Sequence, residues 1–324
     1  MKQIALFPSA APSTILGYGT TSLMRAQSSK ERLALLGIAF DLGIRHFDTA
    51  PYYGYGEAER VLGDFIENKR DQLTITTKYG IQPAAVVKLR TVNLLARRVL
   101  RLFPFLREAL SKRAQLLSQK CPFTAAAARR SLEQSLSALK TDRVDLFLLH
   151  EPTYADAASE EIHQFLQAEL RLGRIRAFGC GGDFHVIEQI ANAKLPTSKW
   201  LQFEDNILNR RIEKIRPNGA KCITYRTFHQ ALAALTGWLE AAPGRYGDWE
   251  SQLQIDMRTE GTLASLLQAA SHSRNPDGIV LFSSHRADRI RSAVRVASEN
   301  RFSSQQLRKF DELTKHIGQT GNSH

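Results

Sequence analysis

The chain has 324 residues, 43% of them apolar, which suffices for one large α/β barrel or for two smaller domains. No apolar run approaches about 18 residues, which excludes a membrane-spanning helix, and the first residues do not look like a secretory signal, so we expect a cytoplasmic protein. The net charge of +12 is concentrated in residues 83–123, which hold nine bases and one acid, and this argues against a uniformly basic nucleic-acid-binding fold.

Short apolar and β-branched runs recur along the chain with helical patterns between them. Most of these runs are apolar throughout, as expected for strands buried on both faces of a parallel sheet. We predict strands over 14–19, 44–49, 73–78, 144–150, 175–180, 199–204, 220–226 and 278–284. Apolar residues at i, i+3 or i+4 spacing predict helices over 29–42, 57–68, 124–139, 159–171, 184–193, 207–215, 259–272 and 286–299.

Eight strands alternating with eight helices favour a single (β/α)8 TIM barrel over residues 1–324. A doubly wound sheet is less favoured, because no G-x-G-x-x-G follows the first strand. Ser28 or Ser29 is expected to cap the first helix. The three cysteines are widely spaced and predict neither a disulfide framework nor a metal site.

One segment does not fit the alternation of strands and helices. Residues 83–123 follow the third strand and predict a basic helical insert, which could pack on the barrel, act as a lid for an acidic ligand, or dock on an acidic partner or anionic membrane. Residues 228–258 predict a long loop on the active-site face. Its Trp238, Tyr246 and Trp249 could form an aromatic wall of the pocket or pack as an ordinary loop.

Polar residues stand where several predicted strands end, the face on which barrel enzymes carry their active sites. Asp48, Lys78 and His150 end the second, third and fourth strands, and Tyr53 follows Asp48 in a loop. Neighbouring strand ends lie about 5 Å apart, so these four side chains can meet. A lysine beside a tyrosine favours the phenolate, an aspartate keeps that lysine charged, and a neutral histidine can orient a substrate carbonyl.

These residues resemble the aldo-keto reductase family. The resemblance covers most of the chain, in the family's order, through the motifs GYGTT (17–21), FDTAPYYGYGEAERVLG (47–63), TTKYG (76–80), DLFLLHEP (145–152), GRIRAFG (173–179), LQFEDNIL (201–208) and ITYRT (223–227). It implies hydride transfer between a nicotinamide cofactor and a small carbonyl substrate. Tyr53, rather than Tyr52 or Tyr55, matches the proton donor, supported by Asp48, Lys78 and His150.

The resemblance also implies NADPH as the cofactor. The expected nicotinamide pocket contains Gly19, Thr20, Thr21, Asp48, Gln202 as a carboxamide partner and Tyr225 as a stacking ring. FSSHRADRIRSA, after the last strand, resembles the family's 2′-phosphate loop, with Ser284 and Arg289 at its serine and arginine positions and Arg286 as an additional candidate. A guanidinium suits a phosphate because its donors form a fork.

The chain departs from the family pattern at three places. Gly181 and Gly182 stand where a Ser-Asn pair commonly holds the nicotinamide carboxamide, Ala293 replaces a common adenine-contacting Asn, and Ser283 stands at a frequent phosphate-binding Lys. These changes predict weaker cofactor binding. They leave open an alternative, a weakly nucleotide-binding regulatory or docking barrel that uses its basic insert for partner contact.

Overall fold

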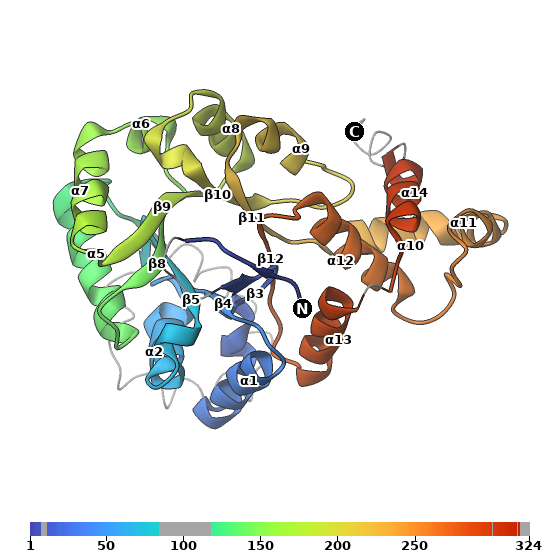
Figure 1. Cartoon of the computed structure of the whole chain (residues 1–324), viewed down its shortest axis with the longest axis horizontal. Helices are drawn as coiled ribbons and strands as arrows, with labels where there is room; N and C mark the ends of the chain where they lie inside the picture. Colours follow the sequence, from blue (N-terminus) through green and yellow to red (C-terminus); the bar gives the residue numbers. More distant parts are fainter. Residues whose placement is uncertain (8–11, 84–117, 300, 316, 318–324) are drawn as a thin grey trace.

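The computed structural model describes residues 1–7, 12–83, 118–299, 301–315 and 317 of the chain. Eight parallel strands close into a barrel in chain order, which confirms the predicted fold class (Figure 1). They are β3 (Leu16–Gly19), β4 (His46–Asp48), β5 (Thr74–Tyr79), β8 (Val144–His150), β9 (Ile175–Gly181), β10 (Trp200–Glu204), β11 (Lys221–Tyr225) and β12 (Ile279–Phe282). The register pairs Gly19 with Asp48 and His150 with Gly181, so the carboxyl ends of these strands lie level.

A ring of helices packs its apolar faces on the outside of the barrel. These are α1 (Ser29–Asp41), α2 (Glu57–Ile66), α5 (Ala125–Ala138), α7 (Glu160–Arg171), α8 (Phe184–Asn192) and α13 (Ala287–Ser298), with the short α6 (Tyr154–Ala157) and α9 (Ile212–Ile215) between them. α12 (Thr262–Arg274) lies beside α13. Ser28 caps α1, because its hydroxyl accepts the backbone N–H of Glu31. The helix predicted over 207–215 is reduced to α9, since the side-chain oxygen of Asn206 accepts the N–H groups of Leu208 and Asn209 in a turn.

A second core lies beside the barrel and is built by helices near the carboxyl end of the chain. It contains α10 (Ala231–Glu240), α11 (Arg245–Leu253), α12 and α14 (Ser304–Lys315), which Figure 1 shows together on one side of the molecule. The ring of Trp249 lies 5.4 Å from that of Trp238 and 5.7 Å from that of Phe310. The segment 228–258 therefore holds two packed helices, and its tryptophans stabilise this second core instead of forming a wall of the pocket.

In the described part of the chain, two antiparallel strand pairs stand outside the barrel. β1 (Gln3–Ile4) pairs with β2 (Ser13–Thr14), and the adjoining Leu6 and Phe7 cluster with apolar side chains of the strands. β6 (Ile81–Pro83) pairs with β7 (Ser118–Lys120) and joins the two ends of the predicted insert. Residues 84–117 lie outside the described residues, so the helical character and the role of the insert stay predictions. Among the helices that the structure describes, none is long and apolar enough to cross a bilayer.

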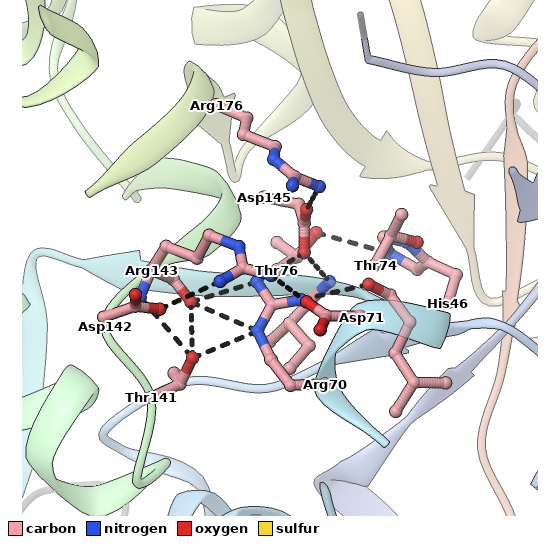
Figure 2. A network of polar contacts seen from close by, with 12 residues as sticks. His46, Arg70, Asp71, Thr74, Thr76, Thr141, Asp142, Arg143, Asp145 and Arg176 are labelled. Carbon is pink, nitrogen blue, oxygen red and sulfur yellow. Dashed lines mark hydrogen bonds and ion pairs between the residues drawn. The ribbon is translucent and has the colours of Figure 1, made fainter. Parts of the chain in front are cut away.

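A buried ion-pair network stabilises the amino-terminal end of the barrel, opposite the site described below (Figure 2). Asp145 on β8 accepts hydrogen bonds from Arg70, Arg176 and the backbone N–H of Ile75, at 2.8, 2.7 and 2.8 Å. The carboxylate is fully buried, and it is stable there because three donors replace the water it has lost. Nearby, the buried His46 ring bonds the hydroxyl of Thr74 at 2.9 Å.

Candidate active site

The four predicted catalytic side chains meet at the carboxyl end of the barrel. Lys78, at 1% exposure, donates from Nζ to Oδ1 of Asp48 at 2.6 Å and to the carbonyl of Thr49 at 3.0 Å. The same Nζ lies 3.3 Å from the hydroxyl of Tyr53. Burial alone would lower the pKa of Lys78, but the charges and hydrogen bonds of Asp48 and Tyr53 raise it above the ordinary value. The ammonium therefore stays charged beside the phenol.

His150 lies against the ring of Tyr53. The two ring centroids are 6.3 Å apart and the planes are nearly perpendicular. Burial, assisted by the charge of Lys78, lowers the pKa of His150 to about 3. The imidazole is thus neutral at physiological pH and has one N–H to donate.

Local backbone geometry brings these groups together. Tyr53 begins a 3₁₀ turn (Tyr53–Gly56) that leads into α2, with Gly54 and Tyr55 in the left-handed region. Gly80 follows β5, and a Cβ there would lie 2.3 Å from the carbonyl oxygen of His150. Only a glycine allows β5 and β8 to approach this closely beyond Lys78.

Asp48 is bound on both of its carboxylate oxygens. Lys78 contacts Oδ1, and Nε2 of Gln202 donates to Oδ2 at 2.7 Å. Behind them, the buried hydroxyl of Thr20 donates to the backbone carbonyl of Asp48 at 3.1 Å. Thr20 and Gln202 are thus both bonded to Asp48, the first through its backbone and the second through its carboxylate.

A cavity of about 920 Å³ opens above this cluster and extends across the barrel mouth to α13. We call the part around Tyr53, His150, Gly181, Gln202 and Tyr225 the inner end, and the part at α13 the outer end. Of the predicted site residues, the cavity is lined by Gly19, Thr21, Asp48, Tyr53, His150, Gln202, Tyr225 and Arg289. Lys78 and Thr20 lie buried behind this lining.

The outer end differs in detail from the sequence prediction. Arg289 lines it, together with Ser283, Ser292 and Ala293. The Ser284 side chain is buried outside the lining, and its hydroxyl accepts the backbone N–H of Arg286 at 3.1 Å. Ser283 instead donates to the carbonyl of Gly19 at 2.6 Å and joins β12 to the first loop.

Several lining residues were not singled out from the sequence. Phe228, His229 and Leu232 come from the segment before and within α10, and Glu260 and Gly261 precede α12. Glu151 also lines the cavity, at the inner end. Its place directly after His150 was the one signal that could have identified it, because the other contacts come from distant parts of the chain.

A family model described as the Aldo/keto reductase family matches residues 15–315. The chain belongs to the aldo/keto reductase family. Its fold also matches an aldo-keto reductase of Bacillus halodurans in the holo form, with a TM-score of 0.69 over 97% of both chains at 18% identity. A glycerol dehydrogenase of Gluconobacter oxydans matches with a TM-score of 0.67 at 18% identity, over 96% of this chain and 94% of the other.

Curated relatives within the family are oxidoreductases by name. D-threo-aldose 1-dehydrogenase of a Pseudomonas species is 34% identical over 178 residues, which cover 51% of this chain and 49% of the relative. L-glyceraldehyde 3-phosphate reductase of Escherichia coli K12 is 26% identical over 318 residues, covering 86% and 82%. Pyridoxal 4-dehydrogenase of Microbacterium luteolum is 44% identical over 70 residues, covering 21% and 20%. The chain thus spans about half the length of the first relative and a fifth of the last.

Proposed function

We propose that this aldo/keto reductase family member is an NADPH-dependent oxidoreductase that reduces an aldehyde, ketone or sugar-like carbonyl, or oxidises the corresponding alcohol. The contact of Lys78 Nζ with both Asp48 Oδ1 and the Tyr53 hydroxyl carries the proposal. A buried lysine that is already neutralised by a carboxylate has little structural reason to approach a phenol as well. It has a catalytic reason, because a nearby ammonium stabilises the phenolate that remains after proton donation.

The cavity fits a dinucleotide with a 2′-phosphate. Tyr225 lines the inner end, where its ring can stack on the nicotinamide. Arg289 lines the outer end, where its guanidinium can bind the 2′-phosphate. Gly181 and Gly182 line the cavity beside Gln202 without adding side chains to it. When bound, the nicotinamide cofactor supplies the hydride chemistry.

The residues of this chain then have separate tasks. Tyr53 donates its hydroxyl proton to the carbonyl oxygen of the substrate, and Lys78 stabilises the resulting phenolate. Asp48 keeps the lysine charged and in place. Neutral His150 donates an N–H to the same substrate oxygen and orients it, because donors placed where charge develops lower the barrier of the step. The substrate class is supported by the names of the relatives, which include an aldose and a sugar phosphate.

Tyr53→Phe tests the proposal, because it removes only the hydroxyl. General acid catalysis contributes about 10²- to 10⁴-fold, so turnover with a panel of aldehydes, ketones and sugars should fall by that factor. The dissociation constant for NADPH, measured by fluorescence titration, should stay within a factor of about two. Near-normal turnover by the variant would remove Tyr53 from the mechanism, and failure of the parent protein to bind NADPH would remove the cofactor assignment.

A further inference from the structure

We propose that the carboxylate of Glu151 binds the nicotinamide end of the cofactor and makes the site hold the oxidised cofactor more tightly than the reduced one. The inference rests on the proposed function. Gly181 and Gly182 occupy the positions at which the family commonly has a Ser-Asn pair, so they offer no side chain to hold the nicotinamide end of the cofactor. Glu151 is the acid that lines the cavity beside these glycines.

Glu151 is held at this place by the last residue of β9 and by the loop that follows it. Its backbone N–H donates to the carbonyl of Gly181 at 2.8 Å, and its Oε2 accepts the N–H of Asp183 at 3.0 Å. A Cβ on Gly182 would lie 2.7 Å from the same Oε2. The carboxylate therefore occupies space that a side chain at 182 would need, so the glycine and the glutamate depend on each other.

The backbone at Glu151 is also unusual. Its φ is +55°, in the left-handed region that residues with a Cβ avoid. Such a conformation persists only where surrounding contacts impose it, and it is concentrated at functional sites. Here it follows His150 directly, so the strain lies beside the proposed reaction centre.

The charge of Glu151 has no ion-pair partner among the residues that the structure describes. Within the ranges that the structure describes, no lysine, arginine or histidine forms an ion pair with it, whereas Glu204 on β10 pairs with Arg226 at 3.0 Å and with Arg211 at 3.7 Å. The effect of this charge is seen at Tyr225. Burial is the largest cause that raises the pKa of its phenol, and the charge of Glu151 is the second largest. Among the described residues, a carboxylate without an ion-pair partner thus acts on the ring that lines the inner end.

This charge distinguishes the two states of the cofactor. The oxidised nicotinamide ring carries a positive charge and the reduced ring is neutral, while the rest of the two molecules is the same. A carboxylate a few ångströms away in a half-buried cavity therefore stabilises only the oxidised state, by a factor of roughly 3 to 30 in affinity. One Oε atom is bonded to Asp183, and the other is available to accept an N–H of the carboxamide.

Glu151→Gln tests the inference, because glutamine keeps the size and an oxygen acceptor for Asp183 while removing the charge. Dissociation constants for NADP⁺ and NADPH are measured by tryptophan fluorescence for the parent and the variant. The ratio of the NADP⁺ constant to the NADPH constant should rise about 3- to 30-fold, through weaker NADP⁺ binding. Glu204→Gln is the matched control, since it removes a charge near Tyr225 that is already paired, and its ratio should stay that of the parent.

The nicotinamide-free fragment 2′-phospho-ADP-ribose should bind the parent and Glu151→Gln equally. An unchanged ratio in Glu151→Gln, an equal loss of both cofactors, or the same shift in Glu204→Gln would overturn the role of Glu151 and leave the proposed function in place. Binding of neither cofactor by the parent protein would instead overturn the proposed function itself.

Discussion

The amide of Gln202 donates to Oδ2 of Asp48 at 2.7 Å, on the opposite side of the carboxylate from Lys78. Gln202 thereby helps to orient Asp48, in addition to the carboxamide contact that the family resemblance implies for it. An oxygen of a buried carboxylate left without its donor costs about 1–3 kcal/mol. We therefore expect Gln202→Leu to lower the free energy of unfolding by about that amount and kcat by about tenfold.

Urea unfolding and steady-state kinetics with NADPH check this prediction. A variant that lost only cofactor affinity, with unchanged kcat and unfolding free energy, would show that Gln202 acts on the cofactor alone.

Arg289 lines the outer end of the cavity, and its replacement tests the NADPH assignment. A charge-assisted hydrogen bond contributes about 1.5–3 kcal/mol, or roughly 10- to 150-fold in affinity. Arg289→Ala should therefore weaken NADPH binding by up to that factor and leave NADH binding nearly unchanged. The control is Arg286→Ala, because Arg286 is exposed, pairs with Asp288 and lies outside the cavity lining. Equal affinities of the parent protein for NADPH and NADH would contradict the assignment.

The buried network around Asp145 should determine stability without affecting chemistry. Asp145→Asn leaves Arg70 and Arg176 without their carboxylate, and breaking a buried pair costs about 3–5 kcal/mol. We expect chemical denaturation to show a loss of that size, with kcat of the folded fraction unchanged, because the network lies at the opposite end of the barrel. Asp142→Asn serves as the control: its side chain is 83% exposed, so the loss should stay below about 1 kcal/mol.

The half-buried His272 predicts a loss of folding stability at acid pH. Burial lowers its pKa to about 4 in the folded protein, against about 6.5 when unfolded. Between these values the unfolded chain binds more protons than the folded one, so stability falls as the pH drops from 6.5 towards 4, by about 1.4 kcal/mol per pH unit. His46 and His150 act in the same direction, since burial lowers the pKa of each to about 3.

His272→Gln should remove the contribution of His272 to the pH dependence of the unfolding free energy. Between pH 7 and pH 5 the parent should lose about 2 kcal/mol more than the variant, as measured by urea unfolding at the two pH values. The same loss in both proteins would mean that His272 is protonated in the folded state.

Local sequence patterns predicted the barrel because its strands are short apolar runs. The strand predicted over 144–150 is β8 itself, and 73–78 differs from β5 by one residue at each end. The helix α14 (Ser304–Lys315) was missed although Leu307, Phe310 and Leu313 have helical spacing. Eight strands and eight helices already accounted for a complete barrel without this helix. Its apolar face packs on α11 and α12 in the second core, which the alternation of strands and helices does not predict.

The placement of a site residue was predictable where its side chain stands at a strand end, as for Asp48, Lys78 and His150. It was not predictable where the role depends on which neighbour a side chain meets. The hydroxyl of Ser284 caps the backbone of Arg286, and Ser283 faces the cavity instead. Likewise, the position of Glu151 depends on a left-handed backbone and on Gly182, which directly follows the next strand.

The pairing of β6 with β7 creates a point of the barrel at which one loop can be replaced by another. Pro83 and Ser118 are register partners, so the chain leaves the barrel mouth and returns to it at neighbouring points about 5 Å apart. The Tyr79 hydroxyl donates to the carbonyl of Pro122, and the N–H of Cys121 to that of Gly80, so this junction is bonded to the barrel itself. A reverse turn of two residues can close such a pair. Loops of different length and sequence can thus be inserted here, beside Lys78, without changing the barrel. The junction is therefore a suitable position for redesigning substrate preference.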